Sequence, residues 1–181
     1  FFILAMFLIG LLSDIKIINS AKLRIILQFI VIFSLIISFD LKILSTRIAP
    51  FDQLLETNFI NYLFVSFCIL IIVNGSNFID GLNTLVIGYY SIITIIIYKV
   101  NLLSVIPIDS SLILSWISLL LFIYVLNLLN KLFLGDSGAY FLGFSYAILL
   151  IMIHNQDLSV SPFFIILLLW YPGFEILFSI I

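Results

Sequence analysis

The sequence predicts an all-α protein, a polytopic bundle of about seven transmembrane helices. Its residues are 65% hydrophobic and only 9% charged, against about 25% charged residues in soluble domains. The mean hydropathy is +1.40, and several charge-free runs approach the roughly 20 apolar residues that a spanning helix needs. These runs lack the alternating pattern of a membrane β-strand, and lipid offers the backbone no hydrogen-bond partner. We therefore expect helices.

Seven charge-free runs supply the expected spans, in the order 1–13, 25–39, 57–79, 81–98, 110–130, 137–155 and 158–174. The second run is short, but Arg24 precedes it and can extend its charge to the membrane interface. Residues 40–58 hold Pro50 and several charges, so we expect them to form the longest loop between spans. No second domain is visible in the sequence.

The chain starts at Phe1 inside one apolar run and ends at Ile181 inside another. We therefore expect 1–181 to be a single integral membrane domain, truncated at both ends. No basic patch indicates a nucleic-acid partner. The only cysteine, Cys68, excludes a disulfide framework and is expected to pack as a small apolar residue.

Three aspartates follow odd-numbered spans: Asp14 the first, Asp80 the third and Asp136 the fifth. Because odd-numbered spans end on the same side of a membrane, we expect these carboxylates to converge on one face. That face has four Lys and Arg residues against three on the other, which weakly favours a cytoplasmic orientation. The single histidine, His154, lies on the opposite face and is expected to be structural.

Two of these aspartates lie in polar turns that suit a divalent metal and a phosphate-bearing substrate. Mg²⁺ usually takes one or two carboxylates together with substrate phosphates and water, and Asp80 and Asp136 could supply them. Gly81 would let the backbone approach a phosphate closely, and Lys131 could contact it as a point charge. For an isolated aspartate a helix cap is the more common role, and Lys131 alone fits an interfacial anchor.

The remaining candidates would recognise the organic part of a substrate. Asn77 and Asn83 carry both hydrogen-bond donors and acceptors, which suit a sugar or a base. Phe133 could stack on an aromatic ring, although ordinary apolar packing is the common role of such a side chain. Three aspartates on one face, two of them in turns with glycine, asparagine and serine, are difficult to explain as helix caps alone.

The polar turns resemble those of the polyprenyl-phosphate N-acetylhexosamine-1-phosphate transferases. This is glycosyltransferase family 4, which is related to phospho-N-acetylmuramoyl-pentapeptide transferase and undecaprenyl-phosphate GlcNAc-1-phosphate transferase. Asn77-Phe-Ile-Asp-Gly-Leu-Asn83 resembles its Asn-x-x-Asp-Gly-x-Asp loop, and Phe133-Leu-Gly-Asp-Ser-Gly138 resembles its Phe-Met-Gly-Asp-x-Gly loop. Leu11-Leu-Ser-Asp-Ile-Lys16, followed by Arg24 and Gln28, resembles its Asp-Asp loop and the next helix. The second and third motifs together are specific.

The resemblance implies transfer of a sugar-1-phosphate, GlcNAc-1-phosphate or a related N-acetylhexosamine, from a UDP-sugar to undecaprenyl phosphate with release of UMP. Such an enzyme is a Mg²⁺-dependent phosphotransferase, with Mn²⁺ as an alternative, that serves cell-envelope polysaccharide, lipopolysaccharide or peptidoglycan synthesis. It implies a multi-pass protein of the bacterial inner membrane with a cytoplasmic catalytic face. The expected partners are the UDP-sugar, the polyprenyl phosphate and the membrane; a homodimer is left open.

Carried over by position, the resemblance gives catalytic roles to Asp14, Asp80 and Asp136, with metal binding by Asp136 and Asp80. Substrate binding would fall to five residues: Asn77, Asn83, Phe133, Lys131 and Gly81.

Two departures keep other functions open, because Ser13 and Asn83 stand where the family has aspartates. A phosphate monoester is already largely ionised at neutral pH, so loss of a base at position 13 need not abolish transfer. The alternatives are phospho-N-acetylmuramoyl-pentapeptide transfer, a degenerate non-catalytic homologue and a polytopic transporter. A transporter would also place acids in an apolar bundle, but usually within its spans rather than at their ends.

Overall fold

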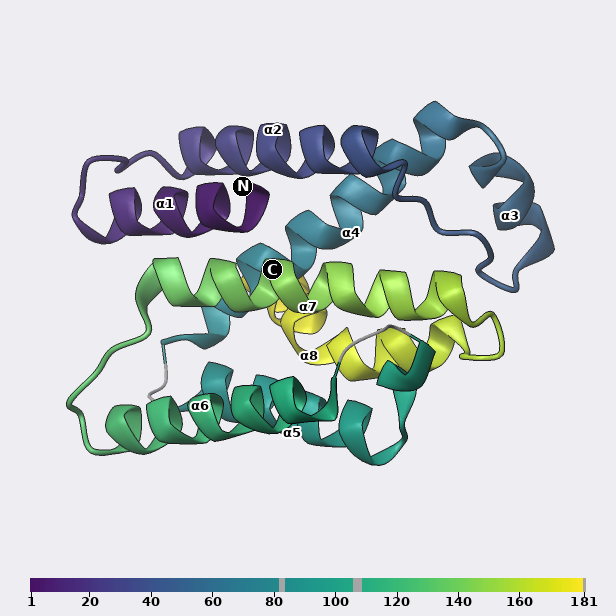
Figure 1. The fold of residues 1–181 in the computed structure, drawn as a ribbon. Helices are drawn as coiled ribbons and strands as arrows, with labels where there is room; N and C mark the ends of the chain where they lie inside the picture. The colour runs from purple at the N-terminus through teal and green to yellow at the C-terminus, as the bar shows by residue number, and fades with distance from the viewer. Residues whose placement is uncertain (82–83, 106–108, 181) are drawn as a thin grey trace.

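The computed structural model describes residues 1–81, 84–105 and 109–180, and no residue in these ranges forms a β-strand. The helices are α1 (Phe2–Asp14), α2 (Ala21–Phe39), α3 (Ala49–Leu55), α4 (Asn58–Ile79), α5 (Leu85–Lys99), α6 (Ser110–Leu128), α7 (Gly135–Gln156) and α8 (Pro162–Ile180), with a 3₁₀ turn at Leu102–Val105. Figure 1 shows them as a helical bundle, with the short helix α3 at its right-hand end. The all-α prediction is confirmed.

Each predicted span corresponds to one apolar helix. Four helices, α2, α4, α6 and α7, are long and apolar enough to cross a membrane. The shorter apolar helices are α1, α5 and the part of α8 at Pro162–Ile176. The predicted span 81–98 differs at its start, because Thr84 has a positive φ of 72° and the helix begins at Leu85. The polytopic helical bundle is therefore consistent with the structure.

The loop expected at 40–58 contains an additional short helix, α3. Pro50 lies in the first turn of α3, where its missing N–H removes no helical hydrogen bond. The Asp52 carboxylate binds the segment just before the helix, accepting from the Thr46 backbone N–H at 2.6 Å and from the Ser45 hydroxyl at 3.0 Å. One of the charges that predicted a loop between spans, Asp52, therefore helps to order that loop.

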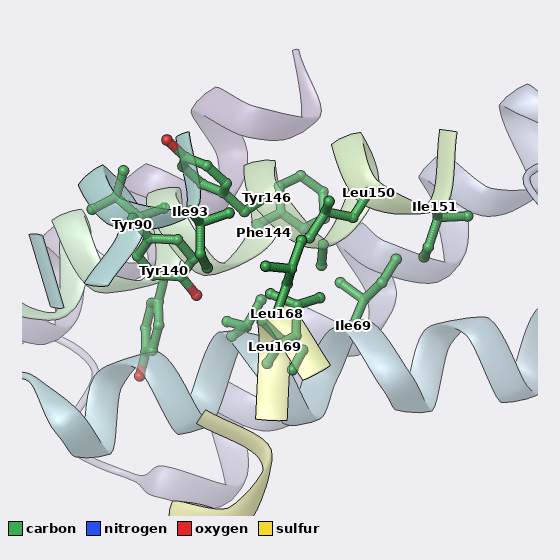
Figure 2. Packing of buried hydrophobic residues seen from close by; sticks show 14 of the residues in the cluster. Ile69, Tyr90, Ile93, Tyr140, Phe144, Tyr146, Leu150, Ile151, Leu168 and Leu169 are labelled. Atoms are coloured by element: carbon green, nitrogen blue, oxygen red, sulfur yellow. The ribbon is translucent and has the colours of Figure 1, made fainter. Parts of the chain in front are cut away.

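Helix α7 is central to the bundle. It packs against α1 and α4, while α4 also contacts α2 and α8, and α5 pairs with α6. Buried side chains from α4, α5, α7 and α8 belong to one apolar core, and Figure 2 labels Ile69, Tyr90, Phe144 and Leu168 among its members.

Buried hydroxyl groups connect the core helices. Tyr90 and Tyr146 have ring centroids 4.6 Å apart. The Tyr90 hydroxyl lies 2.5 Å from the Ser76 hydroxyl on α4, and the Trp116 indole N–H of α6 donates to the Tyr146 hydroxyl at 3.1 Å. Because a buried tyrosine hydroxyl needs a partner, these contacts fix the relative positions of α4, α5, α6 and α7.

The end of α7 remote from the three aspartates is tied to the neighbouring loops by His154. Its Nδ1 lies 2.9 Å from the Val160 carbonyl oxygen and its Nε2 lies 2.8 Å from the Ser45 carbonyl oxygen. The side chain is buried. This position agrees with the structural role expected for the histidine.

Candidate functional site

Asp14, Asp80 and Asp136 lie at the same end of the bundle. Asp14 is the last residue of α1, Asp80 follows the last residue of α4, and Asp136 is in the first turn of α7. These helix ends meet at the left of Figure 1. The convergence predicted by counting spans is confirmed.

The N-terminus of α7 is capped by a carboxylate from another helix. Its N-cap residue, Leu134, makes no side-chain capping bond. Instead, Asp14 Oδ1 accepts from the Asp136 backbone N–H at 2.8 Å and Oδ2 accepts from the Ser137 N–H at 3.1 Å. The first N–H groups of a helix have no intrahelical partner and carry a partial positive charge. Asp14 therefore stabilises the start of α7 and fixes the direction of the Asp136 backbone.

Two glycines allow α1 to approach α7 this closely. A Cβ on Gly10 would lie 2.4 Å from Ser137 Cα, closer than side-chain atoms pack. Gly135 has a positive φ of 66°, and a Cβ there would lie 2.8 Å from Asp14 Oδ2. Gly81, which we expected to permit close approach of a phosphate, is less constrained, because a Cβ there would lie 3.7 Å from the Phe78 carbonyl oxygen, an ordinary contact distance.

The Asp136 carboxylate accepts three hydrogen bonds from three different helices. Asn77 Nδ2 on α4 donates to its Oδ1 at 2.5 Å. Ser13 Oγ on α1 and Arg24 Nη1 on α2 each donate to its Oδ2 at 2.6 Å. The same Arg24 nitrogen also lies 2.6 Å from Ser13 Oγ. These three contacts together hold the Asp136 carboxylate in one orientation.

Arg24 is the site residue that the sequence reasoning missed. Its place just before an apolar run suggested an interfacial anchor, but its guanidinium turns to Asp136 and forms an ion pair at 2.6 Å. The two partners are 112 residues apart in the chain. The sequence held one signal for this role. Arg24 follows the stretch Leu11–Lys16, which resembles the Asp-Asp loop of the family.

Asp80 lies just outside the spanning helix α4. The pKa of its carboxyl group is raised to about 7. Burial is the main cause, and the charges of Asp136 and Asp14 raise the pKa further, while the Gly135 backbone N–H partly opposes them. Two neighbouring carboxylates resist ionising together unless a cation is shared between them. Asp80 therefore lies where a bound cation would favour its ionised form.

This donor set fits Mg²⁺. No group of three or more His, Cys, Asp or Glu side chains suited to a metal occurs within 1–81, 84–105 and 109–180. Mg²⁺ does not need such a group, because it commonly takes one or two carboxylates and completes its shell with phosphate oxygens and water. Asp80 and Asp136 match that requirement.

The other predicted residues are less closely gathered. Asn77 contacts Asp136 directly, whereas Lys131 and Gly81 have exposed positions near the same end. Phe133 is 69% exposed, in the connection between α6 and α7. Asn83 lies outside the described residues.

An apolar groove of about 640 Å³ runs beside the site, between α1, α6 and α7. Its walls include Phe7, Trp116, Leu120, Phe133, Leu134 and Phe141. Ser137 and Gly138 also line it, so the groove reaches the first turn of α7, where Asp136 lies. A long apolar chain could lie in this groove with a polar head at the carboxylates.

Comparison with known proteins gives one family. No curated protein and no solved structure matches the chain. The model of glycosyl transferase family 4 matches residues 1–154, which include the three aspartates, Ser13, Arg24 and Asn77. The chain therefore belongs to glycosyl transferase family 4, the polyprenyl-phosphate sugar-1-phosphate transferases.

Proposed function

We propose that this protein transfers an N-acetylhexosamine-1-phosphate from a UDP-sugar to a polyprenyl phosphate and releases UMP. The observation that carries the proposal is the meeting of Asp80 and Asp136 at the N-terminus of α7, beside an apolar groove. Carboxylates that can share a cation suit a pyrophosphate, and the groove suits the lipid. Family membership supports the same class of reaction.

In the proposed reaction, an oxygen of the lipid phosphate attacks the sugar-bearing phosphorus of the UDP-sugar. A new P–O bond forms, and the bond from that phosphorus to the bridging oxygen breaks, so the electron pair leaves with UMP. The acceptor is already largely ionised at neutral pH, since the second pKa of a phosphate monoester is about 6. Ser13 at the position of a family aspartate is therefore compatible with activity.

In this reaction the protein's own residues mainly hold the charged groups of the site in fixed positions. Bound at Asp80 and Asp136, Mg²⁺ would neutralise charge on the pyrophosphate and on the departing UMP. Asn77 holds Asp136 Oδ1, and Asp14 holds the backbone of Asp136 and Ser137. Such fixed geometry is what phosphoryl transfer requires, because the reaction depends on alignment and charge stabilisation rather than on covalent chemistry by the protein.

The groove supports a lipid acceptor rather than a soluble one. Its lining is almost entirely apolar, and it includes Ser137 and Gly138, which follow Asp136 in the first turn of α7. An isoprenoid chain in the groove would place its phosphate near the carboxylates. A transporter is less well supported, because the three aspartates lie at helix ends and Asp14 caps the start of α7.

The test uses the full chain in lipid nanodiscs with undecaprenyl phosphate, Mg²⁺ and one labelled UDP-sugar at a time. UDP-GlcNAc, other UDP-N-acetylhexosamines and UDP-N-acetylmuramoyl-pentapeptide form the panel. We expect UMP and a labelled lipid in equal amounts with an N-acetylhexosamine donor. Product only from the pentapeptide donor would assign the protein to phospho-N-acetylmuramoyl-pentapeptide transfer. No product from any donor would favour a non-catalytic homologue.

A further inference from the structure

The Asp136 carboxylate is already paired with a cation from the protein itself. Arg24 Nη1 lies 2.6 Å from Asp136 Oδ2, and the two side chains are only 25% and 24% exposed. Hydrogen bonds between charged partners are stronger than neutral ones, and partial burial limits screening by solvent. A divalent cation that binds Asp136 Oδ2 must therefore displace or share this contact.

The charges around Arg24 explain why it pairs with Asp136. Asp14 is the one carboxylate in α1, and its two oxygens accept backbone N–H groups of α7. Ser13 contacts the guanidinium at 2.6 Å without bringing a counter-charge. A carboxylate at position 13 would give Arg24 a partner of its own, whereas the hydroxyl leaves its charge to Asp136.

We propose that Arg24 is a positioning residue that competes with the metal for Asp136, and that the neutral Ser13 makes this competition strong. The inference rests on the proposed function in one respect, the binding of a divalent metal at Asp136. Arg24 keeps the carboxylate oriented when no metal is bound, and it lowers the affinity for the metal. If a divalent metal took Asp136 Oδ2, the Arg24 guanidinium would be free to contact a phosphate at the same site.

A purely structural role for Arg24 predicts a different result. If the arginine only ties α2 to α7, its removal loosens the site, and metal affinity falls or stays the same. Competition predicts that metal affinity rises when the charge of Arg24 is removed. The direction of the change therefore separates the two roles.

The experiment titrates Mn²⁺ alone into the full chain in nanodiscs and measures free Mn²⁺ by electron paramagnetic resonance. We expect Arg24→Gln to lower the Mn²⁺ dissociation constant about tenfold, which corresponds to about 1.4 kcal/mol. Lys22→Gln removes the same charge from the same turn of α2, but its exposed side chain is screened, so affinity should not change. Asp136→Asn should abolish the site.

A second pair of variants tests the role of Ser13 and remains informative if Arg24→Gln does not fold. Ser13→Asp should also tighten Mn²⁺ binding, because Arg24 gains its own partner. Ser20→Asp adds the same charge at the N-cap of α2, where aspartate is an equally good cap, and should have little effect. Equal tightening by Ser13→Asp and Ser20→Asp would show a general charge effect and overturn the inference.

Unchanged or weaker Mn²⁺ binding by a folded Arg24→Gln variant would also overturn the inference that Arg24 competes with the metal. The absence of an Asp136-dependent Mn²⁺ site in the unmutated protein would overturn it as well. These outcomes can be distinguished from failure of the proposed transferase function, because Mn²⁺ affinity and transfer are measured separately. Transferase activity with an unaltered Mn²⁺ affinity in Arg24→Gln would refute the competition and keep the transferase. Tighter Mn²⁺ binding by Arg24→Gln, in a protein that transfers no sugar phosphate, would support the competition and refute the transferase function.

Discussion

Replacing Asp14 by asparagine tests whether this carboxylate acts on the fold or on the substrate. Both of its oxygens accept backbone N–H groups at the start of α7, at 2.8 and 3.1 Å. Asparagine keeps the size and one acceptor oxygen, but its NH₂ group would face an N–H and its charge is lost. The helix loses one capping bond and the favourable interaction with its dipole.

The expected cost follows from those two losses. A capping substitution costs about 0.5–2 kcal/mol, and removal of a negative charge at a helix N-terminus costs a further 0.3–1 kcal/mol or so. Asp14 is exposed, so the sum should be about 1.5 kcal/mol. For a chain of this size, about 2–4 °C of melting temperature corresponds to 1 kcal/mol, which gives a fall of roughly 3–6 °C.

The assay compares thermal unfolding and transferase rate for Asp14→Asn in the same nanodiscs. We expect both to fall, because a less ordered start of α7 misplaces Asp136. Asp157→Asn, a matched change at the opposite end of α7, should leave the rate unchanged. An unchanged melting temperature with loss of transfer would refute the capping explanation and give Asp14 a direct role with the substrate.

Three further predictions concern the same site. The raised pKa of Asp80, about 7 against 3.8 when unfolded, means that the folded state holds the extra proton, so Asp80 destabilises the fold progressively as pH rises from about 4 through 7. Asp80→Asn should therefore raise unfolding stability at pH 8 and change it little near pH 4; equal effects at both would contradict the pKa. In the unmutated protein, Mn²⁺ affinity should weaken as pH falls through about 7. Gly135→Ala should lower stability by about 1–3 kcal/mol because of its positive φ and the contact with Asp14, whereas Gly81→Ala should be close to neutral in the same unfolding measurement.

Run length predicted most of the fold. The seven apolar helices of the described residues follow from charge-free segments, because only a helix satisfies its own backbone within lipid. The short helix α3 could not be predicted, since Pro50 and the surrounding charges also suit a loop, and its order depends on the contact between Asp52 and Thr46. The start of α5 was misplaced because Thr84 adopts a positive φ, which hydropathy does not register.

The convergence of the three aspartates could also be predicted, because it needs only the order of the spans. The contacts of Asp136 could not, since Ser13, Arg24 and Asn77 come from three helices and lie 123, 112 and 59 residues away in sequence. Helix rotation decides which side chains face one another, and a uniformly apolar sequence says little about rotation. For the same reason the apolar groove beside Phe133 appeared only in the structure.

The most direct test of the proposed site compares Asp136→Asn with Asp157→Asn in the transfer assay, with and without Mg²⁺. The two changes are chemically identical and lie at opposite ends of α7. We predict that Asp157→Asn forms the labelled lipid and UMP in a Mg²⁺-dependent reaction, and that Asp136→Asn forms neither although it remains folded. Equal activity of the two variants, or transfer that needs no divalent metal, would contradict a transferase site built on Asp136.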